Sequence, residues 1–264
     1  MTRPLFQTSE PLVIAALHLP DFARGPQRPV GWLEEYVATN ARVFAEAGIP
    51  WVKLQDATRS ADTAARPETL ALMASLGRLI RQECPELGLG IIIEAHDPRA
   101  AIAVAHATGA GFVRLKVFVG GMMTAQGPRY GLGAEALAYR AQIGAEGIAT
   151  LADIHDRTAF SLTPESQPFA AEWAEKTGAD GLIITGADLD DSCARIDALR
   201  KAGITRPVLI GGSVSARNVA QALGVAQGVI VSTALMRKDA APSDMLRWDR
   251  ETCLRFMDAA REGT

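Results

Sequence analysis

Eight short apolar runs, each followed by a segment with apolar residues at helical spacing, predict an α/β protein that forms a single closed (β/α)8 barrel. The runs are nearly continuous in Val, Ile and Leu, which is typical of parallel strands buried on both faces. No Gly-x-Gly-x-x-Gly motif opens the first helical segment, which argues against an open dinucleotide-binding sheet. A length of 264 residues suits one such domain, and we expect residues 12–260 to form the barrel, with 1–11 as an N-terminal extension.

The boundaries of the expected elements have local causes. Gly48, Gly109 and Gly178 follow the last helical residues, where a left-handed residue is favoured. Asp97 before Pro98 supplies a capping side chain ahead of a proline in the first turn. The expected strands are Val13–His18, Trp51–Gln55, Leu89–His96, Gly111–Val117, Ala149–His155, Gly181–Thr185, Val208–Gly211 and Gly228–Ser232. The expected helices are Trp32–Ala47, Pro67–Glu83, Pro98–Thr108, Gly133–Ile143, Pro168–Lys176, Asp191–Ala202, Ala216–Leu223 and Met245–Ala260.

The composition excludes several classes of protein. The formal net charge is −3 and the basic residues are interspersed, so we expect no nucleic-acid partner, which would need clustered Lys and Arg. No apolar run reaches the roughly 18 residues that cross a bilayer, and residues 1–11 lack a signal-peptide pattern, so we expect a cytoplasmic protein without membrane contact. Cys84, Cys193 and Cys253 are too scattered for a disulfide framework or a cysteine zinc site. We expect a homo-oligomer, as for many barrels.

Two neighbouring strand ends predict a phosphate site. The seventh strand leads into Gly211-Gly212-Ser213, and the eighth leads into Ser232-Thr233. Small residues let backbone N–H groups approach an anion, and the dipole of the following helix favours its charge. Loops seven and eight are also where barrels commonly bind phosphate. We therefore expect a small phosphorylated substrate, with an ordinary tight turn as the alternative for the glycines.

Polar residues close the first six strands, at the end where barrel enzymes place their chemistry. Residues two apart on a strand share a face, so Glu94 and His96 should point together. The same argument applies to Asp153 and His155. The expected inward-facing residues are His18, Lys53, Gln55, Glu94, His96, Arg114, Lys116, Asp153, His155 and Thr185, with Asp56 just past the end of the second strand.

Two kinds of proton or carbonyl chemistry can use this set. In the first, Asp153 and His155 move protons next to a carbonyl, while Lys116 or Lys53 stabilises the developing oxyanion. In the second, a lysine desolvated inside the barrel forms a Schiff base, and Lys116 is the main candidate. Both lead to an aldolase-like lyase or an isomerase acting on a phosphorylated metabolite.

Metal binding is the third alternative for the strand-end histidines. His18, His96 and His155 lack helical H-x-x-x-H spacing, so a metal site would depend on convergence in space. We assign no metal ligands and expect His18 and His96 to bind or polarise the substrate. The sequence requires no cofactor, although a divalent metal would be compatible with it.

The buried charges also have a purely structural interpretation. A buried charge is costly unless it is paired. Glu94 with Arg114, and Lys116 with Asp153, could form ion pairs in the upper layer of the barrel. The functional interpretation instead gives Arg114 and Thr185 a place in substrate binding.

One connection, Val119–Leu132, is long and contains glycines and a proline that break any helix. Loops of this length on the catalytic face often act as lids. An ordered cover that closes the barrel is the alternative.

Several segments of the chain resemble the BtpA family, also called the BtpA/SgcQ family. The more specific ones are Gly120–Gly127 in the long connection and Leu151–His155 on the fifth strand, with its Ala-Asp-Ile-His motif. The match runs in order over almost the whole chain. The other segments are Leu17–Pro20, Gly109–Arg114, Leu182–Ala187 and Gly228–Leu235.

This resemblance implies a phosphate-binding (β/α)8 barrel. The family takes its name from a role in photosystem I biogenesis or stability in cyanobacteria, whereas other members look like enzymes of sugar or nucleoside metabolism. Two functions are therefore implied: an enzyme of phosphorylated metabolites, or a non-enzymatic assembly factor. Members tend to carry Asn where this chain has Lys116, and a Lys-His pair where it has residues 156–157. We therefore expect a different substrate for this chain.

Overall fold

The structure is a computed structural model that describes residues 4–6, 11–21, 28–57, 63–155, 159–162 and 166–263, with only the backbone of His155. The strands are β1 (Leu12–His18), β2 (Trp51–Gln55), β3 (Gly88–Ile92), β4 (Phe112–Leu115), β5 (Gly121–Thr124), β6 (Gly127–Tyr130), β7 (Ala149–His155), β8 (Phe160–Ser161), β9 (Gly181–Ile184), β10 (Val208–Ile210) and β11 (Gly228–Val231). The α-helices are α1 (Val30–Glu46), α2 (Pro67–Glu83), α3 (Ala100–Thr108), α4 (Gly133–Gln142), α5 (Gln167–Thr177), α6 (Leu189–Lys201), α7 (Val219–Val225) and α8 (Arg250–Glu262).

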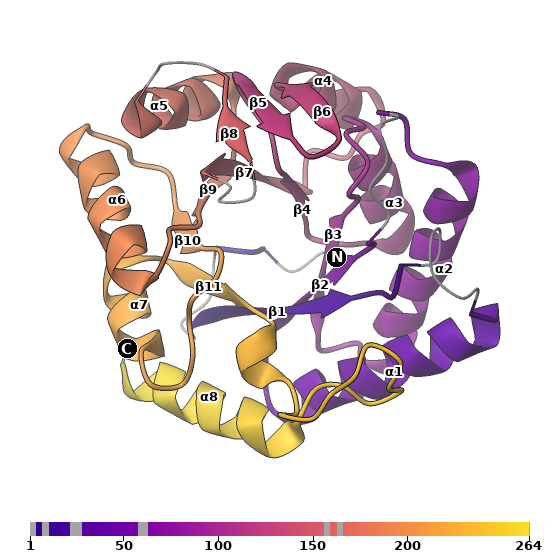
Figure 1. Cartoon of the computed structure of the whole chain (residues 1–264). Helices are drawn as coiled ribbons and strands as arrows, with labels where there is room; N and C mark the ends of the chain where they lie inside the picture. Colours follow the sequence, from indigo (N-terminus) through magenta and orange to yellow (C-terminus); the bar gives the residue numbers. More distant parts are fainter. Residues whose placement is uncertain are drawn as a thin grey trace.

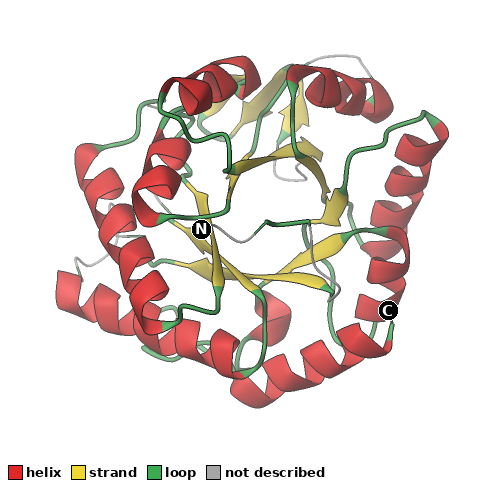
Figure 2. Cartoon of the chain, turned by 180° about the vertical axis from the view of Figure 1, so that it is seen from behind, coloured by secondary structure: helices red, strands yellow, loops and turns green. Residues whose placement is uncertain are grey.

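Eight of these strands form a closed parallel barrel in the order β1-β11-β10-β9-β7-β4-β3-β2. The helices surround the barrel on its outside (Figures 1 and 2). The predicted (β/α)8 fold is therefore confirmed. The third predicted strand is too long, because β3 ends at Ile92 and residues 94–95 form a bend. Among the described residues, no helix has the length and apolarity that crossing a membrane requires.

Large and small side chains interdigitate inside the barrel. A Cβ atom added at Gly88 would lie 2.3 Å from the Trp51 indole, and one added at Gly90 would lie 2.0 Å from the Phe112 ring. The two glycines of β3 thus leave the space that these two aromatic rings fill. Leu5, from the N-terminal segment, is buried in the same interior cluster.

The last two helices begin later than the sequence predicts. Asn40 on α1 donates from Nδ2 to the carbonyl oxygen of Met245 at 2.8 Å, and its Oδ1 accepts from the backbone N of Arg247 at 2.9 Å. These bonds hold the segment before α8 outside a helix. The Asp249 side chain then caps α8 by accepting from the backbone N of Thr252 at 2.8 Å. Helix α7 likewise begins at residue 219 rather than 216.

The long connection after β4 is an ordered β-hairpin. Strands β5 and β6 pair antiparallel, and β8 extends them to a three-stranded sheet between α4 and α5 at the top of Figure 1. Thr124 Oγ1 donates to the Gly127 carbonyl oxygen at 2.9 Å, and Gly127 adopts a φ of 102° that favours glycine. The connection is therefore ordered, and whether it acts as a lid or as a fixed cover stays open. Strand β8 was not predicted.

Candidate active site at the barrel mouth

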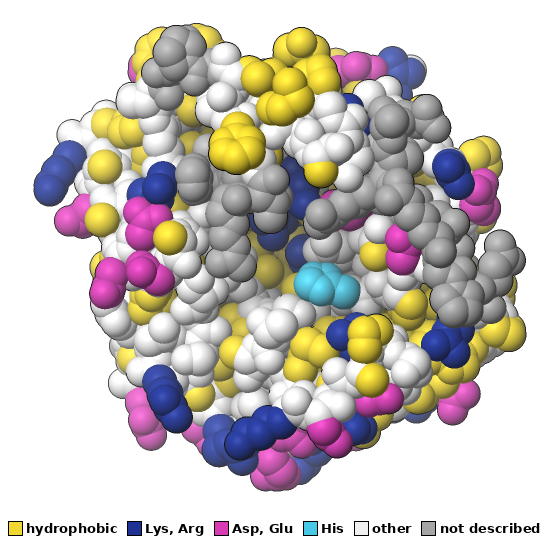
Figure 3. Space-filling model, in the orientation of Figure 1, with side chains coloured by type: hydrophobic (Ala, Val, Ile, Leu, Met, Phe, Trp, Pro, Cys, Tyr) yellow, Lys and Arg dark blue, Asp and Glu magenta, His cyan; other side chains and the backbone are white. Residues whose placement is uncertain are grey.

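The barrel opens at the carboxyl ends of its strands into a cavity of about 350 Å³. Figure 3 shows a hollow at the centre of this face, with Lys or Arg side chains visible at its floor. Two groups of residues line it from opposite sides. The small-residue rim consists of Thr185, Gly211, Gly212, Ser213, Ser232 and Thr233. The charged cluster consists of Lys53, Gln55, Glu94, Arg114, Lys116 and Asp153, of which Glu94 and Asp153 lie behind the lining residues.

The small-residue rim comes from the ends of β9, β10 and β11. A Cβ atom at Gly211 would lie 2.2 Å from Thr185 Oγ1, so this position has room only for glycine. Thr185 Oγ1 is buried and makes no hydrogen bond to the described residues. Ser213 has a φ of 62°, which turns the chain sharply after the two glycines. Ser232 Oγ donates to the Ala16 carbonyl oxygen at 3.1 Å, which ties β11 to β1.

Four of the six residues in the charged cluster form a linear chain of polar contacts. Lys53 Nζ donates to Gln55 Oε1 at 2.6 Å, and Gln55 Nε2 donates to Glu94 Oε1 at 2.6 Å. The other carboxylate oxygen of Glu94 accepts from Lys116 Nζ at 3.0 Å. Lys53 is only 2% exposed, so the chain begins in the interior and ends at the mouth.

The remaining two residues of the cluster form a bidentate ion pair. Arg114 Nε and Nη2 donate to the two oxygens of Asp153 at 3.0 and 2.9 Å. The predicted pairs of Glu94 with Arg114 and Lys116 with Asp153 are therefore wrong. Continuing the register of β3 and β4 places Lys116 opposite Glu94, whereas the longer arginine reaches from one level below to Asp153.

Burial changes the protonation of two groups in the mouth. Burial lowers the pKa of His18 to about 3, so this imidazole is neutral at pH 7. Burial also lowers the pKa of Lys53 well below its ordinary value, and the charges of Arg114 and Lys116 add to this effect. The opposing influence of the Glu94 and Asp153 carboxylates is smaller than the desolvation.

The predicted pair of Glu94 and His96 does not form, and the pair of Asp153 and His155 stays a prediction. Glu94 and His96 lie beyond the end of β3, and His96 Nε2 donates to the Tyr130 carbonyl oxygen of the hairpin at 2.6 Å. On β7, a bulge separates Asp153 from His155, because these residues pair with the adjacent Ile183 and Ile184. The alternation that predicted a shared face is interrupted there. The side chain of His155 lies outside the described part of the chain.

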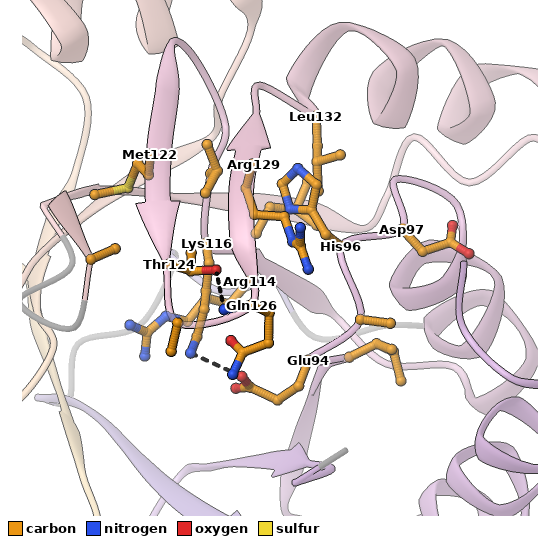
Figure 4. A pocket seen from close by; sticks show the side chains of 16 residues that line it. Glu94, His96, Asp97, Arg114, Lys116, Met122, Thr124, Gln126, Arg129 and Leu132 are labelled. Carbon is orange, nitrogen blue, oxygen red and sulfur yellow. Dashed lines mark hydrogen bonds and ion pairs between the residues drawn. The ribbon is translucent and has the colours of Figure 1, made fainter. Parts of the chain in front are cut away.

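A second, smaller cavity of about 90 Å³ lies beneath the hairpin; Glu94 lines it, and it shares Arg114 and Lys116 with the main cavity. Figure 4 shows the Gln126 side chain pointing toward the Glu94 carboxylate. Burial lowers the pKa of His96, which lines the same cavity.

Sequence reasoning assigned no role to Gln55, Asp56 or the hairpin residues. Gln55 bridges Lys53 and Glu94, and Asp56 Oδ1 accepts from the backbone N of Glu94 at 2.6 Å. The position of Gln55 at a strand end was the available signal. A neutral amide at a strand end does not by itself indicate a catalytic role, as a titratable side chain does.

Within the described residues, no three His, Cys, Asp or Glu side chains come together as a candidate metal site. Cys84, Cys193 and Cys253 are free, and burial raises the pKa of Cys84 to about 11 and that of Cys253 to about 12. These two thiols are therefore protonated at neutral pH.

The fold and its mouth define a (β/α)8 barrel, and solved structures agree. A tryptophan synthase structure from M. tuberculosis has a TM-score of 0.60 and 13% identity, covering 94% of this chain and 92% of that one. A 4-hydroxy-2-oxoglutarate aldolase structure has a TM-score of 0.54 and 16% identity, covering 94% of each chain. At such low identity these likenesses concern the fold alone.

The sequence comparisons identify the family. The BtpA family profile matches residues 9–262, so this chain belongs to the BtpA family. An uncharacterized protein of Pyrococcus furiosus is 29% identical over 225 residues, which cover 84% of this chain and 85% of that protein. The photosystem I biogenesis protein BtpA of a Synechocystis strain is 33% identical over 156 residues, which cover 56% of this chain and 53% of that protein.

Proposed function

We propose that this chain is a barrel enzyme that acts on a small phosphorylated carbonyl compound, as an aldolase-like lyase or an isomerase. One observation supports this proposal above the others: a single cavity has the small-residue rim on one side and the charged cluster on the other. The rim is suited to an anion, and the cluster is suited to a carbonyl.

In this proposal the phosphate lies against Gly211, Gly212 and Ser213, whose missing or short side chains let backbone N–H groups approach it. The hydroxyl groups of Ser232 and Thr233 border the same space. The buried hydroxyl of Thr185, which lacks a hydrogen-bond partner among the described residues, is available to the ligand.

The carbonyl end lies against the charged cluster. Lys116, paired with Glu94, supplies a positive charge that stabilises an oxyanion developing on the substrate. Both oxygens of Asp153 already accept from Arg114, so we assign Asp153 to holding this guanidinium in place. The neutral imidazole of His18 accepts or donates a hydrogen bond rather than carrying charge. An acid–base role of His155 stays a prediction.

A thermal-shift screen tests the proposal. Phosphorylated aldehydes and ketones, inorganic phosphate, the matching neutral sugars and divalent metal salts are added separately to the purified protein. A ligand at a hundred times its dissociation constant should stabilise the folded state by about 2.7 kcal/mol. We expect the phosphorylated compounds to raise the melting temperature and the neutral sugars to leave it unchanged.

The stabilising compounds are then followed by proton NMR in D₂O. Exchange of the proton next to the carbonyl indicates enolisation, and new carbon–carbon cleavage products indicate a lyase. If no phosphorylated compound stabilises the protein, the enzyme proposal is wrong. The name of the Synechocystis relative then favours the alternative, a non-enzymatic assembly factor, and the search turns to a protein partner.

A further inference from the structure

The charged cluster contains three basic and two acidic side chains, and the pairing leaves one base with a neutral partner. Glu94 accepts from Lys116, and Asp153 accepts from Arg114. Lys53 is the base whose described hydrogen bond goes to an amide, Gln55 Oε1. We infer that Lys53 is the nucleophile that forms an imine with the substrate carbonyl. This inference rests on the proposed function and names its substrate class, an aldehyde or ketone.

The position of Lys53 fits a nucleophile. Its side chain is 2% exposed, yet it lines the main cavity together with Thr185 and Gly211 of the small-residue rim. A carbonyl compound whose phosphate lies on the rim therefore has this amine on the facing wall. The amine is shielded from bulk water and open to the ligand.

Gln55 keeps a carboxylate away from this amine. Its Nε2 donates to Glu94, which orients its Oε1 toward Lys53. Glu94 is itself fixed by Lys116 and by the backbone contact to Asp56. The amide thus separates Lys53 from the nearest acidic group of the chain of contacts.

The surrounding charges favour the neutral amine. The titratable groups that act on Lys53 are Glu94 beyond β3, Arg114 and Lys116 beside β4, and Asp153 on β7, and His18 on β1 faces it as well. Burial dominates and lowers the pKa of Lys53, with the two basic neighbours reinforcing it. A neutral amine has the lone pair that attack on a carbonyl carbon requires.

Lys116 was the predicted Schiff-base residue, and its contacts argue against that role. Its Nζ lies 3.0 Å from a Glu94 oxygen, so this amine is already held by a carboxylate. In the inferred step, Lys53 Nζ forms a bond to the carbonyl carbon and loses a proton to the oxygen. The resulting carbinolamine loses its hydroxyl as water, with Lys116 as the proton donor, and a protonated imine remains.

The chain has few lysines, so a lysine adduct can be assigned directly to one residue. The sequence has five lysines, and Lys176, Lys201 and Lys238 lie on exposed surfaces outside the mouth. The whole protein is incubated at pH 7 with glyceraldehyde 3-phosphate or with unphosphorylated glyceraldehyde. Sodium borohydride is added to reduce any imine to a stable secondary amine. Peptide mass spectrometry then locates the adduct.

We expect the adduct on Lys53, at higher occupancy with the phosphorylated aldehyde. The variant Gln55→Glu puts a carboxylate next to the amine and should restore its proton, which removes the adduct while the protein stays folded. An adduct on Lys116, or on the three exposed lysines alone, overturns the inference.

A second test uses a reagent that needs no binding site, so its result does not depend on whether the aldehyde binds. Competitive acetylation with a trace of acetic anhydride at pH 7 should label Lys53 at least about tenfold faster than Lys201, since each unit of lowered pKa raises the neutral fraction tenfold. Equal rates overturn the inference even if phosphorylated compounds raise the melting temperature, in which case the proposed function stands. If no phosphorylated compound binds, the proposed function fails on its own evidence.

Discussion

The two sides of the barrel mouth differ in the size of their side chains and in how far these side chains bind one another. The small-residue rim, from β9, β10 and β11, exposes backbone and hydroxyl groups because its side chains are short. The charged cluster comes from β2, β4 and β7 and from residues just beyond β3 and β4, and its side chains bind one another. A ligand can therefore enter on the rim side. The cluster side is already organised before a ligand arrives.

This difference has an energetic consequence. Each rim residue contacts the ligand space separately, whereas each member of the cluster depends on its neighbours for charge or hydrogen bonding. We expect substitutions in the cluster to change folding stability strongly. Substitutions of the rim hydroxyl groups should change ligand affinity with little effect on stability. The following predictions test that contrast.

The largest effect is expected for Asp153→Ala. Its side chain is fully buried and that of Arg114 is 11% exposed, so the variant leaves a buried guanidinium without its partner. We expect a loss of about 3–5 kcal/mol in the free energy of unfolding, measured by urea denaturation. The double variant Arg114→Met with Asp153→Leu should regain most of this loss. As a control, Glu172→Ala breaks an exposed pair and should cost less than about 1 kcal/mol.

A small effect of Asp153→Ala, below about 1 kcal/mol, would show that the ion pair is solvated in practice. The cluster would then behave like a surface network, and the contrast between the two sides would be lost.

The next effect concerns His18, on the strand between the two sides. Its folded pKa of about 3 is below the ordinary 6.5, so the unfolded chain binds the extra proton first as the pH falls. Stability is therefore lost below pH 6.5, by at most about 1.4 kcal/mol per pH unit, or about 2 kcal/mol by pH 5. When the free energies of unfolding of the wild type and of His18→Gln are plotted against pH, the two curves should converge or cross over this range.

The variant His106→Gln, on an exposed part of α3, controls for replacing a histidine. If the stability difference between wild type and His18→Gln does not change with pH, then His18 titrates as in the unfolded chain. The buried and charged surroundings that we assign to His18 would then be wrong.

The sequence predicted many of the residues that line the barrel mouth, but not the contacts that these residues make with one another. Parallel strands with period-two alternation place Lys53, Arg114 and Asp153 inside the barrel without further information. Local patterns did not reveal that β3 stops at Ile92 or that β7 carries a bulge, since both depend on pairing with neighbouring strands. The first event separates His96 from Glu94, the carboxylate expected beside it.

The choice of ion-pair partners was also beyond the sequence. Lys116 is level with carboxylates on both neighbouring strands, so register alone allows either pair. The reach of Arg114 to Asp153 and the amide of Gln55 decide the outcome. These are properties of side-chain length and of residues far apart in the chain. Likewise, the hairpin cover needed the distant β8 to become a sheet.

A third prediction concerns the small-residue rim. Gly211→Ala places a Cβ atom against Thr185 Oγ1 and into the cavity, so we expect at least about a tenfold loss of affinity for phosphorylated ligands, or about 1.4 kcal/mol. Gly224→Ala is the matched control, because a Cβ atom there meets open space. Isothermal titration calorimetry with the best ligand of the screen gives both affinities. Equal affinities of the two variants would mean that the anion does not bind at the rim.

The smallest effects are expected for single hydroxyl groups of the rim. Thr185→Val removes a buried hydroxyl that has no hydrogen-bond partner among the described residues, so it should leave stability unchanged or slightly raised. Ser232→Ala removes one bond to the Ala16 carbonyl and should cost about 1 kcal/mol of stability or less. Each should weaken binding of the phosphorylated ligand a few-fold, measured by calorimetry.

Double variants test the contrast between the small-residue rim and the charged cluster most directly. If rim residues act separately, the binding losses of Thr185→Val and Ser232→Ala should add within about 0.5 kcal/mol. In the cluster, Gln55→Leu and Glu94→Gln break one chain of contacts, so their stability losses should fall short of additivity by more than that. Additive losses in the cluster, or strong coupling in the rim, would mean that the two sides of the mouth form one network. A ligand phosphate bound at the rim would then affect the protonation of Lys53 on the facing wall.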